Sequence, residues 1–199
     1  MLDVRKLIYM SSFAVYGRTD PDRLPITPDT SVSLKHAYAN SKYMGELAVR
    51  SYSEDFGIKS AIFRAPFVAG EHQTERNVLL EFIQSAQQDK DLVIFWRGNH
   101  VREFLHPIDL VSAFDKALVF LDQSEMPCET LVVGNKPISV NDLAQLVVSK
   151  VGKGQVRHLT QTIDRAFNQY SDTTKAKKLL GWAPTIQVEE IVERILKSN

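Results

Sequence analysis

The sequence predicts an α/β fold built around a parallel sheet. Short apolar runs of the kind found in buried strands alternate along the chain with segments of helical periodicity, and no internal repeat interrupts them. The first apolar run ends in two small polar residues, Ser11 and Ser12. Functional groups of open parallel sheets gather at this carboxyl end of the strands, so the same observation marks the expected position of a site.

Four elements are expected in the first half of the chain. Residues 7–10 are apolar and predict a buried strand, which a proline-containing loop follows. A long helix is expected over residues 36–56, because Gly57 is the residue type that most often ends a helix in the left-handed conformation. A second strand is expected at residues 60–63 and a second helix at residues 78–88.

The second half of the chain continues the alternation. Strands are expected at residues 92–95 and 101–105, on either side of a Gly98-Asn99 turn. Pro107 begins the next helix, because its fixed φ suits a first helical turn. That helix is expected to end near residue 121, and the later elements are a strand at 131–133 and helices at 140–151 (with Ser139 as N-cap), 173–180 and 188–196.

Composition narrows the classes of function. The 199 residues suffice for one ordinary domain, and 24 basic residues balance 24 acidic ones, which gives no electrostatic reason to expect a nucleic acid or an acidic membrane as partner. No apolar run approaches the about 20 residues that span a bilayer. A single cysteine, Cys128, excludes an intramolecular disulfide, and the histidines lack metal-ligand spacing. We therefore expect a soluble cytoplasmic protein without a metal.

The strongest chemical signal is the pair Tyr38 and Lys42. Positions i and i+4 lie on the same face of a helix, so the phenol and the ammonium point the same way. A free phenol titrates near pH 10, and a neighbouring ammonium favours its ionised form, which can accept a hydroxyl proton as hydride leaves the same carbon. Ser12 could hydrogen-bond that hydroxyl. By itself the spacing also fits a solvated pair on a helix surface.

The wider sequence removes that ambiguity, because ordered motifs cover nearly the whole chain. The first are MSSFAVYG at residues 10–17 and AYANSKYMGE at residues 37–46. The others lie at residues 62–70, 77–79, 92–110, 131–134, 139–140, 172–176 and 180–184, the last of these reading LGWAP. The set resembles the extended short-chain dehydrogenase/reductase family, and within it the NAD-dependent nucleotide-sugar epimerases and dehydratases of UDP-galactose 4-epimerase type.

The resemblance implies a fold and an organisation. The fold would be the C-terminal part of a Rossmann-like doubly wound parallel sheet plus a small α/β substrate-binding lobe. Residues 1–70 would be the remainder of a dinucleotide-binding domain, and residues 71–199 mainly the substrate-binding lobe, with interleaved elements returning to the sheet. The Gly-rich phosphate turn that opens such domains is absent, since Gly152-Lys153-Gly154 follows a helix and predicts only a surface turn.

The resemblance also implies residue roles. Ser12 would bind the reacting hydroxyl, Tyr38 would be the general base and acid, and Lys42 would hold the nicotinamide ribose. Tyr38, Lys42, Ala65 and Val68 would contact the cofactor, NAD, with NADP not excluded. The nucleotide-sugar contacts would be Phe67, Asn77, Val78, Val93, Phe95, Arg102 and Arg165, where Arg102 pairs with a phosphate oxygen.

Several of these residues have simpler interpretations. Val93 and Phe95 could be core residues of a strand, Asn77 could cap a helix, and Tyr16 could line the sugar site or only pack. Asp109 is expected to be a residue of the first helical turn rather than a catalytic acid, and His106 a packing histidine. These alternatives stay open at the level of sequence.

Two departures from the family pattern bear on the reaction. Sugar 4,6-dehydratases carry Asp-Glu where this chain has Phe13-Ala14, which argues for epimerase or simple reductase chemistry. Phe67 replaces an asparagine of the family, so the sugar is not defined.

Three functions therefore remain. The first is an epimerase-type oxidoreductase, weak or inactive without the Gly-rich part; the second is a non-catalytic nucleotide-sugar-binding or assembly protein; the third is a reductase of another carbonyl compound. An uncovered sheet edge would make a homodimer possible.

Overall fold

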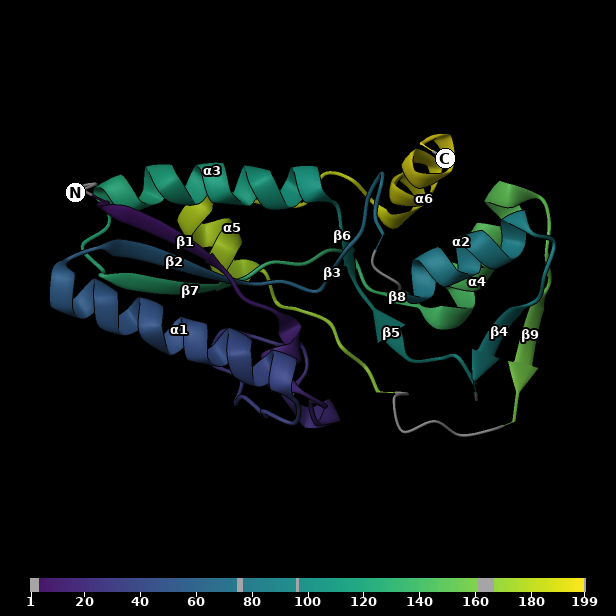
Figure 1. The fold of residues 1–199 in the computed structure, drawn as a ribbon, viewed down its shortest axis with the longest axis horizontal. Helices are drawn as coiled ribbons and strands as arrows, with labels where there is room; N and C mark the ends of the chain where they lie inside the picture. The colour runs from purple at the N-terminus through teal and green to yellow at the C-terminus, as the bar shows by residue number, and fades with distance from the viewer. Residues whose placement is uncertain (1–3, 75–76, 96, 161–166, 199) are drawn as a thin grey trace.

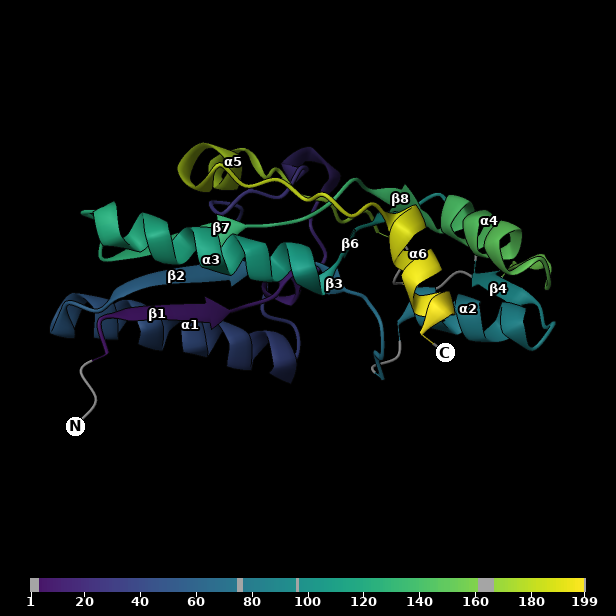
Figure 2. The same cartoon turned by 90° about the horizontal axis from the view of Figure 1, so that it is seen from above.

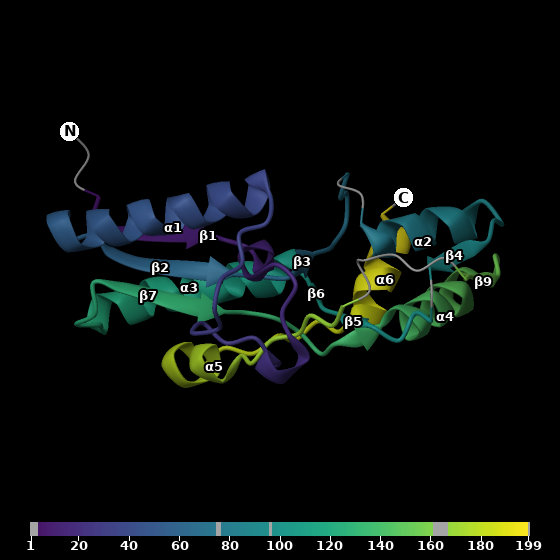
Figure 3. The same cartoon turned by 90° about the horizontal axis from the view of Figure 1, so that it is seen from below.

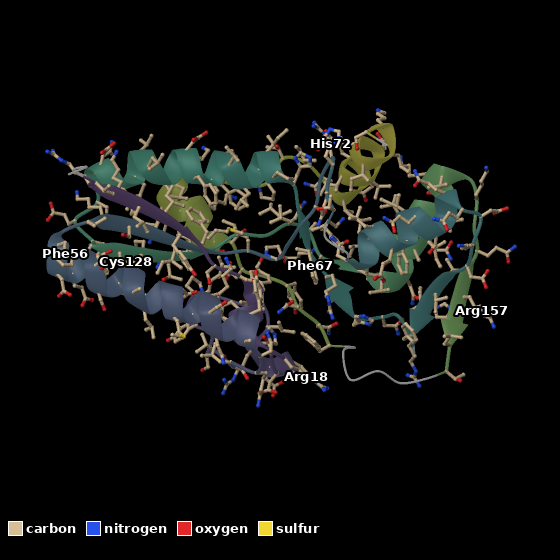
Figure 4. The ribbon with its side chains drawn as sticks, in the orientation of Figure 1. Arg18, Phe56, Phe67, His72, Cys128 and Arg157 are labelled. Atoms are coloured by element: carbon tan, nitrogen blue, oxygen red, sulfur yellow. The ribbon has the colours of Figure 1, made fainter. Side chains whose placement is uncertain are left out.

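The computed structural model describes residues 4–74, 77–95, 97–160 and 167–198, which form two halves (Figure 1). The first half is centred on a parallel sheet of order β1-β2-β7, with β1 at Lys6–Met10, β2 at Lys59–Arg64 and β7 at Cys128–Val132. Cys128, the chain's one cysteine, is half-buried at the start of β7 (Figure 4). The parallel α/β architecture predicted from the sequence is confirmed.

Helices cover both faces of this sheet (Figures 1 and 2). Helix α1, Ala37–Phe56, lies on one face, while α3, Pro107–Gln123, and α5, Thr174–Leu180, lie on the other. Because neighbouring strand residues point to opposite faces, the alternate side chains of β2 meet different helices. Phe63 packs against Phe114 of α3, whereas Ser60 receives a hydrogen bond from Ser53 of α1.

The second half of the fold has its own apolar core. Helices α2 (Val78–Gln87), α4 (Val140–Val151) and α6 (Val188–Lys197) pack together there. Strand β4, Leu92–Phe95, pairs in parallel with β9, Val156–Leu159. Two-residue strands complete the fold: β5 (Val101–Arg102) pairs with β8 (Ile138–Ser139), and β3 (Phe67–Val68) with β6 (Phe104–Leu105).

Two extended segments of the chain lie side by side (Figure 3). The first follows β1 and contains two 3-10 turns, η1 at Phe13–Tyr16 and η2 at Pro21–Arg23. The second precedes α5, and it forms a ladder with the first: the backbone N–H of Ile26 donates to Tyr170 O at 2.8 Å, and that of Asp172 donates to Ile26 O at 2.8 Å. The carboxyl ends of β1 and β2 face these two segments.

The strands predicted on either side of the Gly98-Asn99 turn are present, but the second is divided. Residues 92–95 form β4, which pairs with β9, and residues 101–105 are divided into β5 and β6. Gly98 has a φ of 65°, and its Cα faces the side chain of Asn141, so the turn directs the chain toward α4 rather than back along β4. Strands β3, β8 and β9 were not predicted.

Among the helices that the structure describes, none is both long and apolar enough to cross a membrane.

Candidate functional site

A cavity of about 730 Å³ lies where the carboxyl ends of β1 and β2 meet the second half of the fold. Its described lining comes from both halves. Those residues are Met10, Ser11, Ser12, Phe13, Ala14, Gly17, Arg18, Lys35, His36, Tyr38, Lys42, Ala65, Pro66, Phe67, Val68, Gln73, Asn77, Arg102, Phe167 and Gln169. Figure 4 shows Phe67 between the two halves and Arg18 at the outer end of the turn that follows β1.

Ser12 enters the cavity directly after β1. Its extended backbone, with φ −150° and ψ 155°, makes it the N-cap of η1, and its Oγ accepts a hydrogen bond from the backbone N–H of Ala14 at 3.1 Å. The hydroxyl hydrogen can still be donated, because only the oxygen takes part in that bond. The turn thus presents one hydroxyl donor at the end of a central strand.

Tyr38 and Lys42 lie on the first two turns of α1, which His36 begins by accepting a hydrogen bond from the backbone N–H of Ala39. Lys42 Nζ lies 5.8 Å from the centre of the Tyr38 ring and donates to Met10 O at 3.0 Å. The Tyr38 side chain is 53% exposed, so a ligand can reach the phenol. The two side chains therefore share one face of the helix, and both line the cavity with Ser12.

Close packing of α1 on β1 sets this position. Tyr9 of β1 lies against Gly45, where any Cβ would collide with the Tyr9 hydroxyl, and that hydroxyl donates to Lys42 O at 3.2 Å. Lys42 Nζ also lies 5.7 Å from the centre of the Tyr9 ring. Glycine at position 45 therefore lets the helix approach the strand closely enough for the lysine to reach the strand end.

A buried ion pair between Arg64 and Glu46 connects the elements that carry the site. The Arg64 guanidinium donates to both carboxylate oxygens of Glu46, at 2.9 and 2.7 Å, and Ser11 Oγ donates to the same carboxylate at 2.5 Å. Arg64 also donates to the hydroxyl of Tyr16 and to Pro28 O, each at 3.0 Å. This network links β1, β2, α1 and the loop after η1, so it holds the strand end and the helix in register.

The network settles the open interpretation of Tyr16. The residue is 1% exposed, is outside the described cavity lining, and donates its hydroxyl to Thr27 O at 2.8 Å. Burial raises the pKa of Tyr16 to about 12. Tyr16 is therefore a packing residue in this structure.

The second half contributes a cation to the opposite wall. Arg102 is 9% exposed; its guanidinium lies 4.7 Å from the centre of the Phe167 ring and donates to Phe167 O. Burial lowers the pKa of Arg102 to about 10, which leaves the group charged at neutral pH. A buried guanidinium in the wall of a cavity suits a phosphate or carboxylate oxygen.

Four further residues that were predicted to bind the cofactor or the substrate also lie in the cavity wall. Ala65, Phe67, Val68 and Asn77 line the cavity, and Asn77 also caps α2 by accepting a hydrogen bond from the backbone N–H of Leu80 at 3.1 Å. The cap predicted as an alternative is thus present. Ala65 O is taken by the backbone N–H of Phe13, at 2.9 Å.

Three of the described substrate contacts that were predicted are not in the described lining. Val78 packs partly against the core of the second half. Val93 and Phe95 are each 38% exposed on one face of β4, so they are not the core residues that the alternative interpretation expected. Arg165 lies outside the described residues.

His106 and Asp109, the two polar residues that were expected to be structural, both have hydrogen-bond partners. His106 Nδ1 accepts from the backbone N–H of Ile108, and its Nε2 lies 2.8 Å from Glu71 Oε2. The Asp109 carboxylate accepts from the backbone N–H groups of Thr185 and Ile186 at 3.0 and 2.9 Å. Among the residues that the structure describes, no cluster of three or more His, Cys, Asp or Glu side chains could hold a metal.

Sequence reasoning missed some cavity residues, including Lys35, Gln73 and Gln169. Gln169 Nε2 donates to Phe13 O at 3.4 Å, which connects the segment before α5 to the turn that carries Ser12. No local motif marks these residues, because they enter the cavity through the arrangement of loops.

A parallel sheet covered by helices on both faces, with a cavity at the carboxyl ends of its strands, is a Rossmann-like arrangement. The model of the NAD dependent epimerase/dehydratase family matches residues 1–134. The chain therefore belongs to the NAD-dependent epimerase/dehydratase family.

Individual relatives cover almost all of the chain. The putative UDP-glucose 4-epimerase of Methanocaldococcus jannaschii is 30% identical, over 98% of this chain and 63% of the relative. The dTDP-D-glucose 4,6-dehydratase of Mus musculus is also 30% identical, over 98% of this chain and 55% of the relative. The structure of UDP-glucuronic acid 4-epimerase from Bacillus cereus, in complex with UDP-glucuronic acid and NAD, is 25% identical with a TM-score of 0.78, over 99% and 62%. The chain thus spans 55–63% of the length of these relatives.

Proposed function

We propose that the chain carries the catalytic and substrate-binding part of an NAD-dependent nucleotide-sugar epimerase, with NADP as the alternative cofactor. The observation that carries the proposal is the meeting of Ser12, Tyr38 and Lys42 with Arg102 in one cavity. Three of these groups suit a reacting hydroxyl and the fourth suits the diphosphate. The relatives with epimerase names support the choice of substrate class.

The residues present fit a nicotinamide cofactor, because Tyr38, Lys42, Ala65 and Val68 all line the cavity. When bound, NAD would accept a hydride from the sugar and later return it. Tyr38 would take the hydroxyl proton from the carbon that is oxidised and give a proton back when that carbon is reduced. Ser12 would hold the same hydroxyl, and Lys42 would place its ammonium beside the phenol and the ribose. Return of the hydride to one face of the oxidised sugar carbon gives one epimer, and return to the other face gives the other.

The lining favours epimerase over dehydratase chemistry. Elimination of water needs an acid and a base next to the oxidised carbon. The part of the lining that the structure describes contains no Asp or Glu; Phe13 and Ala14 occupy the positions after Ser12. An epimerase needs no further carboxyl group, since one tyrosine can serve both half-reactions.

The test is the substitution Tyr38→Phe. We expect interconversion of UDP-glucose and UDP-galactose, measured in the presence of NAD, to fall by at least about 100-fold, because the acid–base group is lost. Tyr52→Phe is the matched control, since Tyr52 is an exposed tyrosine of the same helix outside the described lining.

Equal loss of turnover in both variants would contradict the role of Tyr38, and so would unchanged turnover in Tyr38→Phe. Wild-type protein that binds both NAD and UDP-sugars without any turnover would favour the non-catalytic binding protein. Oxidation of NADPH by other ketones, without epimerisation, would favour the carbonyl reductase.

A further inference from the structure

A third group of cavity residues comes from the chain between β3 and α2, of which residues 69–74 and 77 are described. Asn77 is the N-cap of α2. Within this segment, Gln73 and Asn77 line the cavity. Asn77 has a structural partner, whereas no structural contact accounts for Gln73.

The loop is held firmly on either side of that position. The backbone N–H of Ala69 donates to Leu105 O at 2.9 Å, and Gly70 lies so close to Pro107 that a Cβ would come within 2.8 Å of its Cδ. Glu71 then reaches His106 Nε2 at 2.8 Å with one oxygen and Arg194 at 3.4 Å with the other. Gln73 therefore occupies its place in the wall because its neighbours are anchored.

The carboxamide of Gln73 makes no hydrogen bond within the described structure, and its Oε1 is buried. Thr19 Oγ1 and His100 Nδ1 share that state, but neither residue belongs to the described lining. A buried polar atom without a partner destabilises the ligand-free protein. A half-turn of the amide about its last torsion exchanges oxygen and nitrogen, and here it would break no hydrogen bond.

We infer that Gln73 is a specificity residue that binds a hydroxyl of the sugar moiety. The inference rests on the proposed function, which places the reacting carbon at Ser12 and Tyr38 and the diphosphate at Arg102. The sugar then lies between those residues, beside the third group of cavity residues. A hydroxyl both donates and accepts, so it satisfies either orientation of the carboxamide.

The test compares Gln73→Met with wild type. Methionine keeps the length of the side chain and removes both polar atoms. Calorimetric titrations with UDP-glucose and dTDP-glucose, each measured against its free nucleoside diphosphate, give the affinity gained from the sugar. We expect that gain to fall about five- to tenfold, while affinity for the free diphosphates stays unchanged. Unfolding in urea should show that the ligand-free variant is at least as stable as wild type, because an unpaired oxygen is gone.

The matched control is Gln145→Met on the exposed face of α4, outside the described lining, and it should change neither quantity. An unchanged sugar gain in Gln73→Met, or an equal loss of sugar and free-diphosphate affinity, overturns this inference and leaves the proposed function standing. A variant that loses stability with no change in the sugar gain shows a structural role and also overturns it. Wild type that binds no nucleotide sugar overturns the proposed function and this inference together.

Discussion

Glu103 is a carboxyl group whose protonation should control stability. It is 1% exposed, and the backbone N–H and hydroxyl of Ser171 donate to it at 2.7 and 2.8 Å. Gly134 allows this close arrangement, because a Cβ there would collide with both Glu103 and Ser171. Burial raises the pKa of Glu103 to about 7, despite those hydrogen bonds.

Because the pKa of Glu103 is raised in the folded chain, the protein should lose stability as the pH rises. A carboxyl with a raised pKa binds its proton more tightly in the folded than in the unfolded chain, so its contribution is complete below pH about 4.5 and is lost as pH rises through about 7. The full loss is about 3 kcal/mol. We expect the free energy of unfolding of wild type, relative to Glu103→Gln, to fall by about 2–3 kcal/mol between pH 5 and pH 8.

Urea unfolding of both proteins across that pH range measures the difference. Glu54→Gln, at an exposed position of α1, serves as the control and should follow wild type at every pH. A constant difference between wild type and Glu103→Gln would show that the buried carboxyl does not titrate in this window.

Single residues differ in how far the sequence could predict them. The Tyr38–Lys42 pair was predictable, because one helical turn fixes its geometry locally. The resemblance marked Glu46 and Arg64, yet their ion pair depends on the packing of α1 against β2. Gln73 could not be found, since its lack of a hydrogen-bond partner depends on the folded surroundings and not on a local motif.

Asn77 has two roles, because its side chain caps helix α2 and also lines the cavity. Its Oδ1 accepts the backbone N–H of Leu80, so Asn77→Ala should destabilise the protein by about 1 kcal/mol. Asn77→Asp keeps the cap but adds a negative charge beside the expected diphosphate. We expect Asn77→Asp to retain stability and to bind UDP at least about tenfold more weakly, owing to charge repulsion.

Urea unfolding and UDP titration of both variants separate the two roles. Unchanged UDP affinity in Asn77→Asp would leave the residue as a cap only. The cap of α4 offers the comparison, because Ser139 accepts the backbone N–H of Asp142 outside the described lining, and Ser139→Ala should lower stability without affecting UDP.

The long helices were predictable and the short strands were not. Helix α1 begins one residue after the predicted start and ends where predicted, and α4 has the predicted bounds, because caps and apolar periodicity are local signals. Two-residue strands such as β3 and β8 carry no such period. The partner of β4 lies more than sixty residues later, in β9, and no local signal marks that pairing.

The parallel sheet of the first half has an unpaired edge. Strand β1 pairs with β2 on one side, and no described residue pairs with its other side. The two helices that contact β1 expose apolar side chains, among them Met44 of α1, 69% exposed, and Val119 of α3, 61% exposed. The resemblance predicted such an uncovered edge, and the structure identifies β1 as the strand that forms it.

An open strand edge, with exposed apolar side chains on the two helices that contact the strand, favours association. We propose that the 199-residue chain self-associates through this surface, and we expect sedimentation velocity to show a dimer or larger species whose fraction grows with concentration. The double substitution Met44→Lys and Val119→Lys should shift the chain toward monomer, because two charges would have to be buried in the contact. Gln145→Lys on α4 adds a charge away from β1 and should leave association unchanged. A wild-type chain that stays monomeric at all concentrations would contradict the proposal, and equal dissociation by Gln145→Lys would assign the effect to net charge rather than to this surface.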